Sequence, residues 1–93
     1  MSIFTVRIVL HDADSGIYKG LYEVMDNEGF SDIISSTEGI NYKMPDGEYT
    51  ITGVYTKSDI LEKAKKAIKA TTVTGSVLVT ESTGRTWSNL NKV

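Results

Sequence analysis

Residues 3–10 read IFTVRIVL, and apolar side chains alternate along this stretch with a period of two. One face of the expected strand is wholly apolar and consists of Phe4, Val6, Ile8 and Leu10. The opposite face is mixed and consists of Ile3, Thr5, Arg7 and Val9. Because only the apolar face must be shielded from water, we expect this strand to lie in a sheet with helices on one side and an open face on the other.

Two later segments have the helical spacing needed to cover the apolar face. The first follows Asp12, Asp14 and Ser15, any of which can cap it, and it stops at Gly29. The second begins with a capping box over residues 56–59. Its apolar stripe consists of Ile60, Leu61, Ala64, Ala67 and Ile68. Both segments are therefore expected to be amphipathic helices that pack on the sheet.

Strand patterns fill the rest of the chain. FSDIISS (30–36) and EYTITGVY (48–55) are expected strands, with a short run INYKM (40–44) and a Pro-Asp-Gly turn between them, and SVLVTES (76–82) is the last. The order β-α-β-β-α-β predicts a single α+β domain over residues 1–93 with a ferredoxin-like fold. This fold has a four-stranded antiparallel sheet, the first and third strands at its centre and both helices on one face. Residues 85–90 could add a short fifth strand to an exposed edge, on the same subunit or on a partner.

Composition limits the class of protein. The 40% hydrophobic content is that of a globular domain, and the absence of cysteine excludes a disulfide framework and a cysteine-based metal site. The N-terminal apolar run has no basic region before it and is too short for a signal or membrane segment. We therefore expect a cytoplasmic protein without a membrane partner.

Charge is unevenly distributed, although the net charge is only −2. Residues 1–48 hold nine acids and three bases, and residues 49–93 hold three acids and seven bases, giving net charges of −6 and +4. The basic half is either the solvated lysine face of the second helix or a surface for RNA or an acidic partner. The low net charge predicts no bulk attraction to nucleic acid, and we expect no DNA partner.

One end of the expected sheet collects acidic residues. The topology places His11, Asp12 and Asp14 near Asp46 and Glu48. Clustered carboxylates can bind a hard cation or hold a proton, so Asp12 and Asp46 are candidate Mg²⁺ ligands, and Asp12 and His11 are candidate catalytic residues. The alternative is local: Asp12 and Asp14 cap a helix, and Asp46 forms a turn.

Three further residues are candidates for binding RNA. Arg7 lies on the open face, and Arg85 and Trp87, the only tryptophan, follow the last strand. Guanidinium groups pair with phosphate and aromatic rings stack on bases, which suits single-stranded RNA. Arginine and tryptophan are equally typical of protein–protein interfaces, so a homodimer interface is the alternative.

The stretches TVRIVLHDADS, EVMDNEGFS and above all VLVTESTGRTW resemble the GhoS-type endoribonuclease antitoxins of type V toxin–antitoxin systems. The resemblance covers about residues 4 to 91 and implies a ferredoxin-like fold and cleavage or binding of a toxin messenger RNA. No catalytic residue is carried over from the family; if the chain cleaves RNA, we expect Asp12 to hold a metal or take a proton and Arg7 and Arg85 to neutralise phosphate charge. Three functions stay open: an RNA endonuclease antitoxin, a non-catalytic dimeric module that binds RNA or a protein, and a small-molecule sensor.

Overall fold

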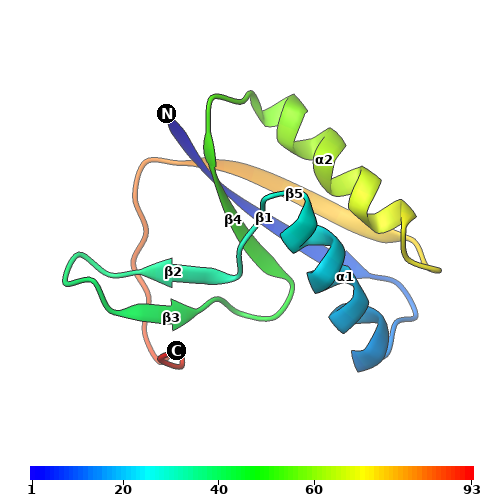
Figure 1. Ribbon diagram of the computed structural model, residues 1–93, viewed down its shortest axis with the longest axis horizontal. Coiled ribbons are helices and arrows are strands. Elements are labelled where there is room, and N and C mark those ends of the chain that lie inside the picture. Colours follow the sequence, from blue (N-terminus) through cyan, green and yellow to red (C-terminus); the bar gives the residue numbers. More distant parts are fainter.

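The computed structural model describes all of residues 1–93 and is a small α+β protein. Its elements are β1 (Ser2–Leu10), α1 (Ser15–Asn27), β2 (Ile33–Ser35), β3 (Asn41–Lys43), β4 (Glu48–Gly53), α2 (Lys57–Lys69) and β5 (Gly75–Ser82). Both helices cover one face of the sheet, and the C-terminal tail crosses toward the β2–β3 hairpin (Figure 1). No helix is both long and apolar enough to span a membrane.

The main sheet has three antiparallel strands in the order β4-β1-β5. The predicted four-stranded sheet is therefore only partly correct, because β2 pairs with β3 in a separate two-stranded sheet. Where a fourth strand would pair with β4, there is only one isolated bridge, in which Ser31 and Thr50 exchange backbone hydrogen bonds of 2.9 and 2.7 Å. After Ser31 the chain leaves β4, and the backbone bond from Met44 to Asp32 (2.7 Å) closes the hairpin on itself. The hairpin consequently projects from the sheet and forms one wall of the groove described below.

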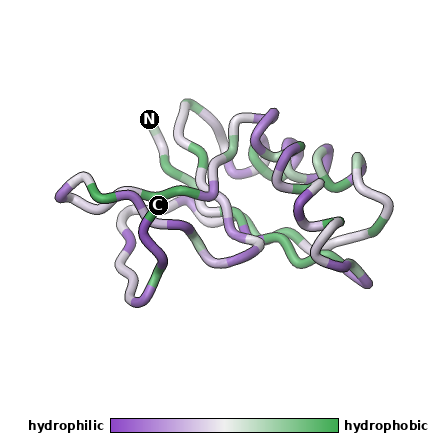
Figure 2. Tube along the Cα trace, turned by 60° about the horizontal axis from the view of Figure 1, so that its bottom comes forward, coloured by the Kyte–Doolittle hydropathy of each residue, from purple (hydrophilic) through white to green (hydrophobic).

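The core lies between the sheet and the helices. The predicted apolar face of β1 is buried throughout, from Phe4 at 0% exposure to Leu10 at 6%. Hydropathy colouring shows apolar stretches in the strands and mixed stretches along both helices, as expected for amphipathic helices on a sheet (Figure 2). The opposite face of β1 stays at least partly exposed and is the open face of the sheet.

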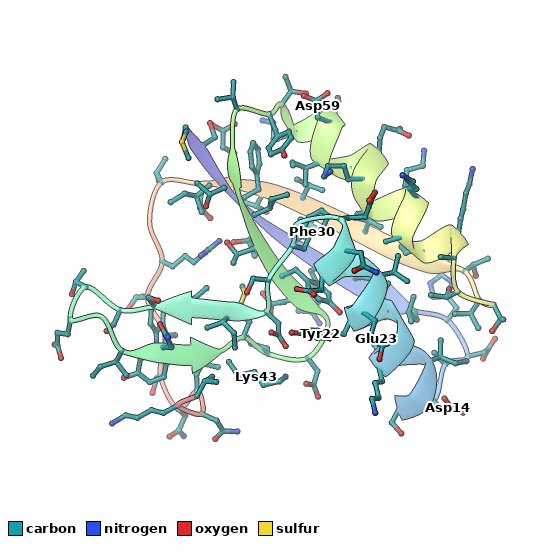
Figure 3. The ribbon with its side chains drawn as sticks, viewed as in Figure 1. Asp14, Tyr22, Glu23, Phe30, Lys43 and Asp59 are labelled. Atoms are coloured by element: carbon teal, nitrogen blue, oxygen red, sulfur yellow. The ribbon has the colours of Figure 1, made fainter.

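The helix boundaries follow the predicted capping chemistry. Asp14 caps α1 by accepting a hydrogen bond from the Ile17 amide (3.0 Å). Residues Thr56 and Asp59 form the capping box of α2 with bonds of 2.9 and 3.1 Å. Gly29 ends α1 with a φ of +94°, a conformation that favours glycine. Asp14 and Asp59 can be seen at the starts of the two helices in Figure 3.

Candidate functional site

An open groove of about 540 Å³ lies where the tail crosses the open face of the sheet. Its walls are the β2–β3 hairpin, the outer part of β4 and residues 82–87. Eight of the lining residues are serines or threonines, namely Ser35, Ser36, Thr37, Thr50, Thr52, Ser82, Thr83 and Thr86. Arg85 is the only charged residue that lines the groove. The groove volume lies within the range of ligand-binding clefts, about 300–1,000 Å³.

Arg85 fastens the tail to the open face. Its Nε donates to Thr5 Oγ1 at 2.9 Å, and its Nη2 donates to Thr50 Oγ1 at 2.8 Å and to the Phe4 carbonyl at 3.2 Å. Thr5 and Thr50 lie side by side in the register of β1 and β4, so the planar guanidinium spans two strands. The arginine is therefore held in one position by the sheet itself.

The charge of Arg85 is not compensated by a paired carboxylate. All three of its hydrogen-bond acceptors are neutral oxygens, and none of the salt bridges of the chain involves it. Burial lowers the pKa of the guanidinium, and the carboxylate of Glu48 acts in the opposite direction. Nη1 donates no hydrogen bond within the protein, and no buried polar side-chain atom lacks a partner, so Nη1 reaches solvent. A half-buried cation with free donors is suited to an anionic ligand.

Trp87 holds the second part of the tail. Its ring meets the Tyr42 ring edge-on, with centroids 5.5 Å apart. Beyond it, Lys43 donates a backbone hydrogen bond to Asn91 (2.9 Å), and Tyr42 forms an isolated bridge with Lys92. The tail thus pairs with the β3 edge of its own subunit, through a bridge and not through a full strand over residues 85–90.

At the predicted acidic end of the sheet, the side chains do not converge on one point. The backbone bonds Ile8 to Gly47 and His11 to Thr74, both 2.8 Å, confirm that β1 ends beside the starts of β4 and β5. The His11 ring turns toward β5, where Nδ1 lies 3.2 Å from Thr74 Oγ1 and Nε2 lies 3.1 Å from Ser76 Oγ. Asp12 is exposed in the turn after β1 and has a φ of +56°.

Asp46 is paired with a lysine. Its carboxylate lies 3.2 Å from Lys43 Nζ and its side chain is 98% exposed. Lys43 Nζ also lies 3.9 Å from Asp32. The chain contains no group of three or more His, Cys, Asp or Glu side chains arranged to hold a metal ion.

A second cavity, of about 780 Å³, lies between α1 and the β3–β4 turn. Arg7 and Asp46 line it, together with three tyrosines, Tyr18, Tyr22 and Tyr49. Figure 3 shows Tyr22 on α1 and Lys43 on the hairpin, on the two sides of this region. The Asp32 carboxylate raises the pKa of Tyr22, and burial raises the pKa of Tyr49 to about 12. Three cationic and three anionic side chains line this cavity (Arg7, Lys19, Lys43; Asp32, Asp46, Glu48), so it offers no net charge to a ligand.

The buried Tyr49 phenol predicts a loss of stability in alkali. The folded protein keeps this proton up to a pH of about 12, whereas the unfolded chain releases it near 10.0. The free energy of unfolding is therefore expected to fall as the pH rises from 10 toward 12, and this group should have no effect at lower pH. The midpoint temperature of thermal unfolding should fall less steeply across this pH range for Tyr49→Phe than for the wild type. Tyr55→Phe, outside the cavity, is the control, and a wild-type slope in Tyr49→Phe would contradict the assignment.

Three residues that hold the tail in place beside the groove were not among the sequence-based candidates. Thr5 and Thr50 receive the guanidinium, and Tyr42 contacts Trp87. The alternating pattern of β1 indicated that Thr5 is on the open face beside Arg7. No sequence signal connected Arg85 with residues 80 and 35 positions away.

Comparison of the chain with protein-family models gave no match. Comparison with curated proteins gave no match either. The function is therefore inferred from the geometry of the groove.

Proposed function

We propose that the tail groove binds single-stranded RNA and that the chain is a non-catalytic RNA-binding module of the cytoplasm. The uncompensated guanidinium of Arg85 carries this proposal, because a phosphate would supply the anion that the fold does not. The hydroxyl-rich walls suit ribose 2′-hydroxyls, and the Tyr42–Trp87 pair offers aromatic surface for a base. The role that the resemblance implies, an antitoxin acting on a toxin messenger RNA, is compatible with binding alone.

Binding is favoured over cleavage by the state of the acidic residues. Asp14 is used in a helix cap, Asp46 pairs with Lys43, and His11 lies beside two hydroxyls. Cleavage by one subunit would need a base or a metal close to the bound phosphate. We therefore expect no RNA cleavage by a single copy, with or without Mg²⁺.

Fluorescence anisotropy of a labelled single-stranded RNA tests the proposal. Trp87→Ala is expected to weaken binding roughly 5- to 150-fold, the effect of losing one stacked base. Trp87→Phe should keep most of the affinity because it keeps a ring. Arg7→Ala is the matched control, since it removes an arginine charge outside the groove. A loss of affinity in Arg7→Ala with none in Trp87→Ala would show that binding follows net charge and not the groove.

The same samples, analysed on a denaturing gel, test the absence of cleavage. Intact RNA after incubation with Mg²⁺ agrees with a binding module. Cleavage that disappears in Asp12→Ala would contradict it and would favour the endoribonuclease that the resemblance implies.

A further inference from the structure

The outer edge of β5 is the longest unpaired strand edge in the molecule. β5 is the last strand in the order β4-β1-β5, and none of the isolated bridges reaches it. Its eight residues, GSVLVTES, contain no proline and no lysine, and Glu81 is their only charge. Edges that stay exposed are normally protected by prolines, lysines or bulges. The edge is therefore suited to pairing with another strand.

Backbone geometry shows which residues of β5 face outward. The bond from the His11 amide to the Thr74 carbonyl identifies a hydrogen-bonded pair of β1 and β5. Because such pairs alternate with non-bonded pairs in an antiparallel ladder, the even-numbered residues of β5 bond to β1. The outward amides and carbonyls belong to Gly75, Val77, Val79 and Glu81.

We propose that a second copy of this chain occupies this edge, with the two β5 strands antiparallel and Leu78 on the twofold axis, so that two sheets join into one. This register alone pairs all the outward residues, setting Gly75 against the partner's Glu81 and Val77 against the partner's Val79. The carboxylate of Glu81 then faces a glycine and not its own copy, so no like charges oppose each other. A second copy fits because the edge is complementary to itself.

The same pairing covers apolar side chains that the single chain leaves in water. Leu78 is 64% exposed on the open face and would lie against its own copy across the axis. Val77 and Val79 are only partly buried at the margin of the core, and each would gain a valine neighbour. The pairing therefore adds both backbone hydrogen bonds and apolar contact.

Pairing in this register also extends the tail groove. Ser82, which lines the groove, would face the partner's Thr74, and Thr74 is paired with His11. The partner's His11 would then lie in the same row of the open face, two strand spacings from Ser82, or about 10 Å. This consequence rests on the proposed function: RNA leaving one groove would reach His11 of the other copy.

Disulfide trapping tests the register directly, since the chain contains no cysteine. Residues opposed in a non-bonded pair have Cα atoms about 4.5 Å apart, within reach of a disulfide. Leu78→Cys should therefore form a covalent dimer under mild oxidation. Thr80→Cys on the same face should not, because its predicted neighbour is the partner's Ser76. Equal trapping of both variants, or of neither, would overturn the register.

Light scattering of the unmodified chain measures the association itself. We expect the mass of two chains for the wild type and of one chain for Val79→Pro, which removes an outward amide and no bond to β1. Thr52→Pro, on the outer edge of β4, is the control and should remain a dimer, with circular dichroism confirming the fold of both. A wild-type monomer at all concentrations would overturn the proposal.

RNA binding separates this inference from the proposed function. If Leu78→Cys forms the covalent dimer but the protein does not bind RNA, the dimer is supported and the proposed function is contradicted. If the protein both dimerises and binds RNA, His11→Ala should lower the RNA affinity of the dimer. The same substitution should leave the RNA affinity of the Val79→Pro monomer unchanged. The same loss in both forms would contradict a shared groove.

Discussion

Phe4→Ala is expected to destabilise the protein by about 3–5 kcal/mol. Phe4 has no exposed surface and lies in the central strand, between Ile51 of β4 and Glu81 of β5. Its removal would leave a cavity among the core side chains between the sheet and the helices. A domain of this length has a total free energy of unfolding of about 5–14 kcal/mol, so the variant should be close to unfolding.

Chemical denaturation followed by circular dichroism measures this loss. Val9→Ala is the control, because Val9 is in the same strand, faces the open side and is 44% exposed. Its cost should stay below about 1 kcal/mol. Equal costs for the two variants would contradict the one-sided core that the alternation of β1 predicts.

Arg85→Ala is expected to release the tail and to abolish most RNA binding. The variant loses three hydrogen bonds that join residue 85 to β1 and β4. Thr5 retains a contact of 3.2 Å to Ser82, and water can reach the other freed acceptors, so we expect a stability cost of only about 1–3 kcal/mol. RNA affinity should fall by at least about tenfold, since the charge in the groove is lost together with the position of Trp87.

Arg85→Lys separates charge from geometry. Lysine keeps the charge but cannot reproduce the planar fork that spans Thr5 and Thr50. We expect it to restore little of the affinity, and limited proteolysis should cut its tail nearly as fast as in Arg85→Ala. Full recovery by lysine would mean that the groove senses charge alone.

The sequence predicted the layers of the fold because local rules decide them. The alternation of residues 3–10, the cap at Asp14, the capping box of residues 56–59 and the glycine stop at Gly29 depend on near neighbours, and all are confirmed. These features determine which face is buried and where the helices begin.

The position of the second expected strand was predicted wrongly for a physical reason. Ile33 and Ile34 are adjacent apolar residues, so residues 30–36 have no clear apolar face. The hairpin satisfies its own backbone, including the bond from Gly39 to Ser36 (2.9 Å) in its turn, and it needs no pairing with β4 beyond Ser31. The sequence does not show which of the two possible pairings this segment adopts.

The candidate site could be predicted only in outline. Arg85 and Trp87 were identified by residue type, but the acceptors of Arg85 come from two strands distant in sequence. For the acidic end, the topology correctly brought the chain segments together, and the directions of the side chains depend on local bonds. The His11 ring lies with the hydroxyls of Thr74 and Ser76 instead of facing Asp46.

The fluorescence of Trp87 measures the central claim most directly, because this residue is the only tryptophan and lies in the groove. Titration with single-stranded RNA should quench the emission to saturation, with less effect from DNA of the same sequence. The slope of log affinity against log salt should be between about −0.7 and −1.4, the value for one or two neutralised phosphates. Unchanged Trp87 emission while anisotropy reports bound RNA would contradict the tail groove as the binding site.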